Sequence, residues 1–216
     1  MQSNTQATNP IAEHKLENTL RYLLVNITCT YLLGAIFYAD PFHFWEHALS
    51  ELGTTVTLLG SPNLAAALIV TMGMFINGRL MLEIARIFRL QYHRQNAKLK
   101  STLMYTASMG SFISIFPNNL FHGIHSIGSA FCIGSIFLFD LTLLLENLKT
   151  HPSLLVKFEF GVLCLGVLSY AVTYFLDFPI KQALQKICVI NLLLVLFLRS
   201  MQTMPARIHS TNHPST

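Results

Sequence analysis

Six stretches of apolar residues limit what this chain can fold into. About 20 apolar residues in a helix are needed to cross the hydrocarbon core of a bilayer, and none of the stretches alternates like a barrel strand. Because backbone groups in lipid must be satisfied within the protein, each stretch is expected to be a helix. The sequence therefore predicts an all-α polytopic integral membrane protein, a bundle of six transmembrane helices. We place them near residues 21–38, 62–82, 101–118, 124–146, 157–176 and 184–200.

The composition is typical of a membrane protein. Hydrophobic residues make up 52% of the chain and charged residues 11%, whereas soluble domains have about 25% charged residues. A length of 216 residues suits a single membrane domain. We divide the chain into a polar cytoplasmic N-terminal tail (1–19), a six-helix transmembrane domain (20–200) and a cytoplasmic C-terminal tail (201–216).

The basic residues predict the orientation of the bundle. Twelve of the fourteen Lys and Arg residues fall on one side of the predicted helices, and Lys181 and Lys186 are the two exceptions. Because cytoplasmic loops are rich in Lys and Arg, both termini are predicted to be cytoplasmic. The net charge of +4 is then a topology signal, so we expect membrane lipid and not nucleic acid as a partner. The basic cluster at 79–100 is placed to contact anionic headgroups.

Histidines concentrate on the opposite, extracytoplasmic side. His43 and His47 are four residues apart, and His122 and His125 are three apart; both spacings place two imidazoles on one helical face. Such pairs suit a divalent cation, and catalytic zinc takes about three protein ligands and a water. These four histidines are therefore candidate metal ligands, with zinc as the candidate cofactor. The alternatives are interfacial histidines between headgroups and water, and structural histidines that bridge helix ends.

The same side carries three candidate catalytic residues. Glu46 and Glu51 are carboxylates that can act as general bases, and Ser50 directly precedes Glu51. The alternative for Glu51 is a solvated loop carboxylate. Ser50 can instead cap a short helix, and no Gly-x-Ser-x-Gly sequence surrounds it, so serine hydrolase chemistry has little support.

One carboxylate lies inside a predicted span. Asp140 belongs to the fourth helix, and acids within a membrane often serve in proton relay or ion binding. Its depth also allows an ion pair with Arg79 of the second helix, or contact with water at the cytoplasmic face. Asn77 and Asn191, also within spans, are expected to form interhelical hydrogen bonds.

Small residues predict which helices touch. Ser126, Ala130 and Gly134 recur every four residues in the fourth helix, and such faces let helices approach closely in lipid. A similar face of the third helix consists of Ala107, Gly110, Ser111 and Ser114. We therefore expect these two helices to pack together.

Several short motifs follow one another in a recognisable order. Leu49-Ser50-Glu51-Leu52-Gly53 follows the first span, and Asn63 comes next; Phe116-Pro117 then ends the third span, before His122 and His125-Ser126. This order resembles a bacterial six-span membrane family, domain-of-unknown-function family nine-nine-eight. The resemblance covers roughly residues 20–200, and His43 and His47 have no counterpart in it. It implies the six-span architecture, in the cytoplasmic (inner) membrane, and no agreed activity.

These features together predict a multi-pass membrane protein that binds a lipid or small ligand at its extracytoplasmic face. The candidate ligand-binding residues are Asn118, His122, His125, Ser126 and Asp140. One alternative is a metal-assisted membrane hydrolase acting on a lipid or amide at the outer leaflet, with Glu46 or Glu51 as its base. A second alternative is a proton-coupled carrier that uses Asp140. The sequence leaves open whether the chain is an enzyme.

Overall fold

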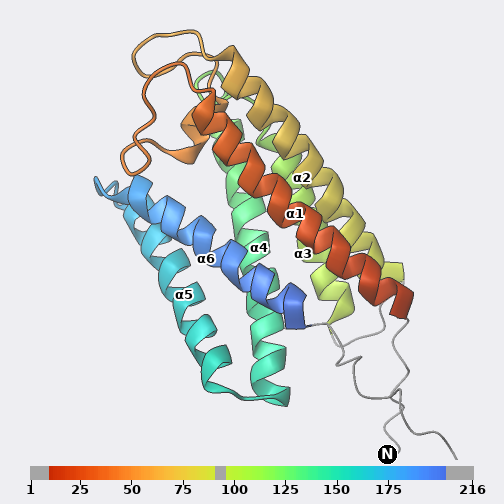
Figure 1. Ribbon diagram of the computed structural model, residues 1–216. Coiled ribbons are helices and arrows are strands. Elements are labelled where there is room, and N and C mark those ends of the chain that lie inside the picture. Colours follow the sequence, from red (N-terminus) through yellow and green to blue (C-terminus); the bar gives the residue numbers. More distant parts are fainter. Residues whose placement is uncertain (1–9, 91–95, 203–216) are drawn as a thin grey trace, which may run out of the picture.

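The described part of the chain is mainly helical (Figure 1). The computed structural model describes residues 10–90 and 96–202, and within these ranges the chain forms six α-helices and one 3-10 helix, η1. Their bounds are α1 (Pro10–Ile36), η1 (Leu49–Gly53), α2 (Leu64–Leu90), α3 (Ala97–Ile113), α4 (His122–Thr150), α5 (Leu154–Phe175) and α6 (Lys181–Gln202). The predicted all-α class is confirmed.

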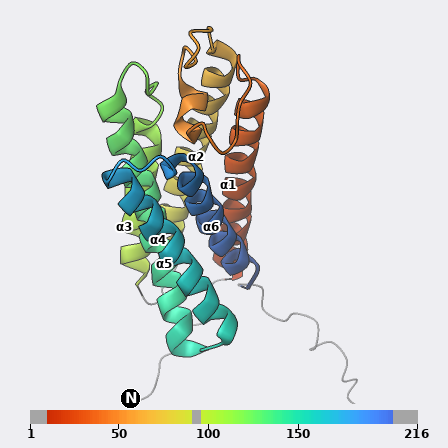
Figure 2. The same ribbon diagram turned by 90° about the vertical axis from the view of Figure 1, so that its left-hand side faces the viewer.

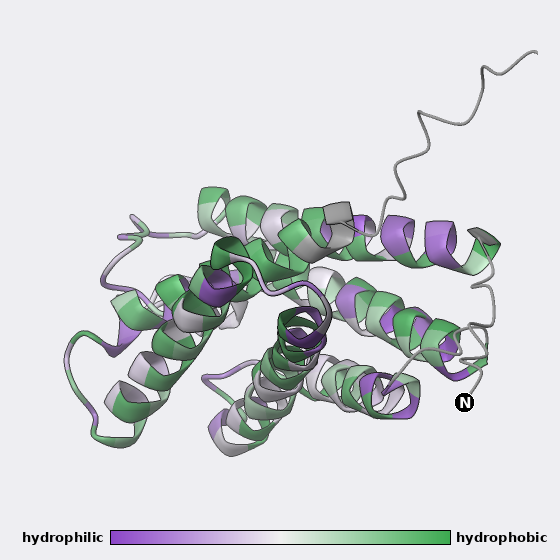
Figure 3. Ribbon diagram, turned by 90° about the horizontal axis from the view of Figure 1, so that it is seen from below, coloured by the Kyte–Doolittle hydropathy of each residue, from purple (hydrophilic) through white to green (hydrophobic). Residues whose placement is uncertain are grey.

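Five of these helices are long and apolar enough to cross a membrane: α1, α2, α4, α5 and α6. Figure 3 shows apolar colour along much of the helices. The exception, α3, has 17 residues, which corresponds to about 26 Å at 1.5 Å per residue, slightly less than the roughly 30 Å hydrocarbon core. The chain is therefore a helical multi-span membrane protein by composition, and the sixth span stays a prediction.

The helices differ from the predicted spans mainly at their ends. α1 begins at Pro10, so part of the segment 1–19 that we expected to be a tail is helical. Proline suits the first position of a helix, where its missing N–H has no partner to lose. Ala12 and Leu16 are buried there, which explains why the helix extends past the apolar stretch. The predicted third span, 101–118, is too long at its C-terminal end, because α3 ends at Ile113, four residues before Pro117.

Two groups of helices make up the bundle. The most extensive contacts join α1 to α2, α2 to α3 and α3 to α4, while α5 pairs with α6. Figure 2 shows α5 and α6 tilted relative to α1, α2 and α3. The connections 37–63, 114–121 and 176–180 lie towards one end, which we call the loop end. The turn between α4 and α5 lies at the opposite end (Figure 1).

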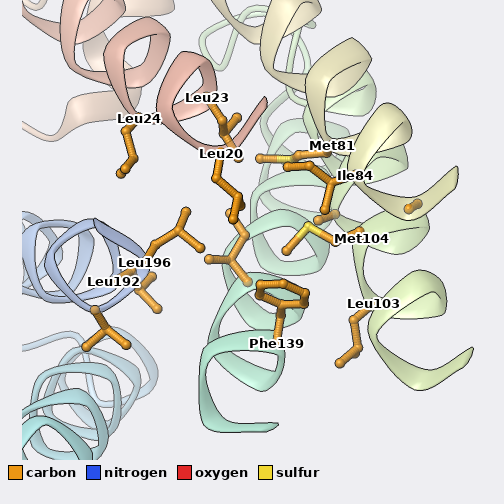
Figure 4. Packing of buried hydrophobic residues seen from close by; sticks show 14 of the residues in the cluster. Leu20, Leu23, Leu24, Met81, Ile84, Leu103, Met104, Phe139, Leu192 and Leu196 are labelled. Atoms are coloured by element: carbon orange, nitrogen blue, oxygen red, sulfur yellow. The ribbon is translucent and has the colours of Figure 1, made fainter. Parts of the chain in front are cut away.

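Buried side chains from several helices meet in one apolar core (Figure 4). Leu23 of α1, Ile84 of α2, Met104 of α3, Phe139 of α4 and Leu196 of α6 are each at most 1% exposed. Because lipid tails are as apolar as these side chains, dispersion contacts and close fit hold such a core together, more than exclusion from water.

Polar side chains add hydrogen bonds between helices. Asn26 of α1 donates to the Gly73 carbonyl (2.9 Å) and to Asn77 Oδ1 (2.8 Å) of α2. Asn191 of α6 donates to the Val162 carbonyl of α5 at 3.3 Å. The predicted interhelical hydrogen bonds of Asn77 and Asn191 are confirmed. The measured contribution of such bonds to stability in a membrane averages about 0.6 kcal/mol each.

The predicted packing of α3 against α4 is confirmed, but the contact uses another face of α4. A Cβ on Gly110 would lie 2.4 Å from the Cys132 backbone nitrogen, and one on Gly128 would lie 2.7 Å from the Ser114 nitrogen. A Cβ on Gly134, in the predicted stripe, would meet no atom within 4 Å. Gly128 is two residues from Ser126, which is about 200° around a helix, so the stripe points away from α3.

The glycine contact between α3 and α4 gives a first prediction. Gly110→Ala forces a methyl group against the α4 backbone, and overpacking of this kind costs about 1–3 kcal/mol. We expect a lower thermal unfolding midpoint in detergent. Gly161→Ala on α5 is the control, because a Cβ there meets no atom within 4 Å. Equal midpoints for the two variants would contradict the close α3–α4 contact.

Candidate functional site

A hollow of about 290 Å³ lies between α4 and α5 near the loop end. Its apolar wall is formed by Ala130, Ile133 and Gly134 of α4 and by Val167, Ala171 and Phe175 of α5. Its polar lining consists of Ser50, Asn118, His122, His125, Ser126, Ser129, Tyr170, Tyr174 and Gln185. We call this space the α4–α5 hollow. Most of its polar residues belong to the start of α4 and to the elements next to it.

His125 is held in one orientation at the start of α4. It is 9% exposed, and its Nδ1 lies 2.9 Å from the Phe116 carbonyl oxygen. A carbonyl oxygen only accepts hydrogen bonds, so Nδ1 carries the proton, and in the neutral ring Nε2 is an acceptor. His125 therefore brings an oriented acceptor to the lining of the hollow.

His122 lies one turn earlier and is exposed. Its Nδ1 lies 2.8 Å from Oδ1 of Asn118 in the α3–α4 connection. The structure thus brings together Asn118, His122, His125 and Ser126, four of the five candidate ligand-binding residues, around one hollow.

Asp140, the fifth candidate, lies elsewhere. It is 0% exposed and sits in α4 next to the core residue Phe139, and it does not line the α4–α5 hollow. Arg79, the partner considered from the sequence, is exposed on α2. Asp140 therefore belongs to the interior of the bundle.

A second hollow, also of about 290 Å³, lies within the α1–α2 connection. It is lined by Tyr38, Asp40, Pro41, His43, His47, Thr57, Leu58 and Leu59, and we call it the Asp40 hollow. The four candidate metal ligands are therefore divided, with His43 and His47 here and His122 and His125 at the α4–α5 hollow. In the described ranges, no three His, Cys, Asp or Glu side chains are grouped to hold one metal ion. The geometry does not support a zinc site shared by the two loops, which stays a prediction.

The two loops nevertheless lie together, as the sequence analysis assumed. Asn119 Oδ1 accepts from the Thr55 backbone N–H (3.1 Å), and Asn119 Nδ2 donates to the Thr55 hydroxyl (3.0 Å). Asn63, 1% exposed, accepts from the Ala39 N–H (3.2 Å) and donates to the Thr54 carbonyl (2.9 Å). These bonds fix the α1–α2 connection against itself and against the α3–α4 connection.

The candidate catalytic residues have different surroundings. Glu46 is exposed, and Ser50 lines the α4–α5 hollow. Glu51 Oε1 accepts from the Ala48 backbone N–H at 3.1 Å, so Glu51 and not Ser50 caps the start of η1. Glu51 lines neither hollow; its Oε1 holds the start of η1, and its Oε2 is buried and makes no hydrogen bond within the described ranges.

Lys186 of α6 is a key residue that the sequence analysis did not single out as functional. It is 1% exposed; its Nζ donates to the Gln182 carbonyl (3.0 Å) and to the His47 carbonyl, and lies 5.6 Å from the centre of the Phe44 ring. The neighbouring Gln185 accepts from the Leu49 N–H at 2.9 Å. The sequence signal that could have identified it is a lysine on the side predicted to be poor in basic residues.

No protein-family model, no curated protein and no solved structure matches this chain. The family resemblance read from the motifs therefore stays a prediction.

Replacement of Lys186 tests whether α6 holds the α1–α2 connection. Lys186→Met keeps most of the side-chain length but removes the donor, and hydrogen bonds to charged groups contribute about 1.5–3 kcal/mol each. We expect a clear drop in the unfolding midpoint. Unfolding is measured by the fluorescence of Trp45, the single tryptophan of the chain. The control is Lys181→Met, because Lys181 pairs with Asp177 at the surface and such pairs contribute little. A midpoint unchanged in both variants would contradict the attachment.

Proposed function

We propose that this multi-pass membrane protein binds a lipid or small amphipathic ligand in the α4–α5 hollow, at its extracytoplasmic face. The observation that carries the proposal is the combination, in one hollow, of polar side chains at the loop end and an apolar wall. Ligand sites are typically concave and mostly apolar, with a few placed polar groups. A lipid has the same arrangement, with a polar head at one end and an apolar tail along the rest of its length.

The small residues of α4 support this proposal. Ser126, Ala130 and Gly134 line the hollow, and no atom lies within 4 Å of a Cβ on Gly134. The stripe that predicted helix contact instead leaves space between α4 and α5. An acyl chain or another slender apolar group fits such a space.

The charge of the lining supports a neutral ligand head. None of the residues that line the hollow is Lys, Arg, Asp or Glu. Phosphate groups are usually bound by Arg or Lys, whereas His, Ser, Asn, Gln and Tyr exchange hydrogen bonds with hydroxyl and amide groups. The proposed ligand therefore carries hydroxyl or amide groups at its head and no phosphate.

The orientation belongs to the same proposal. With both termini cytoplasmic, the loop end is extracytoplasmic and α3 crosses as the sixth span, in contact with α2 and α4. A helix slightly shorter than the bilayer is accommodated by local thinning at modest cost. The proposed location is the cytoplasmic (inner) membrane of a bacterium.

A block of the hollow tests ligand binding. We expect Gly134→Phe to lower labelling by a photoactivatable diacylglycerol about tenfold or more, because a steric cost of about 1.4 kcal/mol lowers affinity tenfold. Gly161→Phe on α5 is the matched control, since that position is open but outside the hollow. The label should map by mass spectrometry to α4 and α5, and a phosphatidylglycerol probe with the same chains should label less. Equal labelling of both variants would refute the proposal.

Fusions of alkaline phosphatase test the orientation. The enzyme is active only outside the cytoplasm, so a fusion after Gly60 should be active and a fusion after Thr150 should be inactive. Green fluorescent protein at the same two positions should give the reverse pattern. An active phosphatase after Thr150 would contradict the six-span topology.

A further inference from the structure

We propose that the Asp40 hollow is a second binding site, for the ammonium group of a primary amine. The site is separate from the α4–α5 hollow and shares no lining residue with it. It therefore does not depend on the function proposed above. The proposal rests on an uncompensated carboxylate, two buried polar atoms with unused hydrogen-bonding capacity, and a group of aromatic rings.

Asp40 supplies the negative charge. Its Oδ1 accepts from the Ser61 hydroxyl at 2.8 Å, and its Oδ2 accepts from the Thr57 hydroxyl. These two hydroxyls fix the carboxylate but do not neutralise it, and no Lys or Arg in the described ranges is in ion-pair contact with it. Each carboxylate oxygen keeps a further lone pair for another donor.

Tyr38 supplies a second polar atom. It lies two residues beyond α1 and is 8% exposed; apart from an approach by the Leu58 backbone amide, its hydroxyl has no hydrogen-bond partner in the described ranges. Burial, and after it the charge of Glu51, raises the pKa of this hydroxyl. The group is therefore neutral at pH 7 and can accept a hydrogen bond as well as donate one.

His47 supplies the third atom. Its Nδ1 is buried and makes no hydrogen bond within the described part of the chain. Buried polar atoms without partners cost about 1–3 kcal/mol each, so a ligand that satisfies both Tyr38 and His47 recovers that cost. A primary ammonium has three N–H donors, and Asp40, Tyr38 and, with its ring proton on Nε2, His47 each have an acceptor atom for one of them.

Aromatic rings pack against one another at this hollow, which Tyr38, His43 and His47 line. The Tyr38 and Phe42 ring centres are 5.5 Å apart, those of Phe42 and His47 are 5.3 Å apart, and those of His43 and His47 are 5.7 Å apart. The faces of aromatic rings attract cations. The hollow of about 290 Å³ also exceeds the space of one water, which is about 10–15 Å³ by the same measure.

The amine has two sources at this place in the fold. Leu58 and Leu59 line the hollow and are 71% and 79% exposed, so they suit contact with lipid at the level of the headgroups. An ethanolamine headgroup and a free alkylamine present the same ammonium group to Asp40. The test below separates the two.

Isothermal titration of the full-length protein in uncharged maltoside detergent tests the site. The probes are propylammonium, 1-propanol as its neutral analogue, and tetramethylammonium, which has charge but no N–H. We expect saturable 1:1 binding of propylammonium, weaker binding of tetramethylammonium and none of propanol. Loss of one charge-assisted hydrogen bond should weaken binding about tenfold or more in Asp40→Asn. Tyr38→Phe, which keeps the ring, should weaken propylammonium binding more than tetramethylammonium binding.

Asp177→Asn is the control for net charge. Asp177 is exposed between α5 and α6 and has a φ of 54°, a backbone conformation that Asn tolerates. The affinity of the Asp177→Asn variant for propylammonium should equal that of the wild type. Failure of the wild type to bind propylammonium, equal binding of propanol, or equal weakening by Asp40→Asn and Asp177→Asn would overturn the proposal. If Asp40→Asn does not fold, the probe series and Tyr38→Phe decide.

Nanodiscs identify the source of the amine. Discs of phosphatidylcholine with and without phosphatidylethanolamine are titrated with propylammonium. Competition by phosphatidylethanolamine indicates that the headgroup occupies the site, and an unchanged affinity indicates a site for free amines. Either result keeps the ammonium group as the ligand and identifies only the molecule that carries it.

Discussion

The attachment of the α1–α2 connection to α6 is the interaction on which both hollows depend. Gln185 and Lys186, adjacent in α6, bond to the backbone of Leu49 and of His47. A buried lysine is costly unless hydrogen-bonded or paired. Here the Lys186 ammonium donates hydrogen bonds to two carbonyl oxygens and makes a cation–π contact with the Phe44 ring. The attachment places Ser50 at the rim of the α4–α5 hollow and positions His47 in the Asp40 hollow. Without it, neither lining would be complete.

The unequal spacing of the helices explains why the α4–α5 hollow exists. Gly110 and Gly128 let α3 and α4 approach until their backbones touch, so α1 to α4 form a dense group. The α5–α6 hairpin has fewer contacts with that group, and α4 reaches α5 mainly near their short connection at the opposite end (Figures 1 and 2). Towards the loop end the facing surfaces are small on α4, so the gap is not filled by side chains of the protein.

The sequence predicted the helical class, the pairing of α3 with α4 and the hydrogen bonds of Asn77 and Asn191, because length, apolarity and buried polar groups in lipid have few solutions. It did not predict which face of α4 meets α3. A stripe of small residues such as Ser126 to Gly134 suits a close contact and an open space equally well, and one sequence does not fix the rotation of a helix. The role of Lys186 was missed because its burial depends on where a distant connection docks. The separation of the two histidine pairs likewise follows from tertiary structure alone.

The measurement that tests the central claim most directly is an electron cryomicroscopy map of the protein purified into nanodiscs of its native membrane lipid. The account predicts continuous density in the α4–α5 hollow, with its head beside His125 and Gln185 and its tail along Ala130 and Gly134. The head density should lack the strong peak of a phosphate. A map in which α5 packs closely against Ala130 and Gly134, leaving no space, would contradict the account.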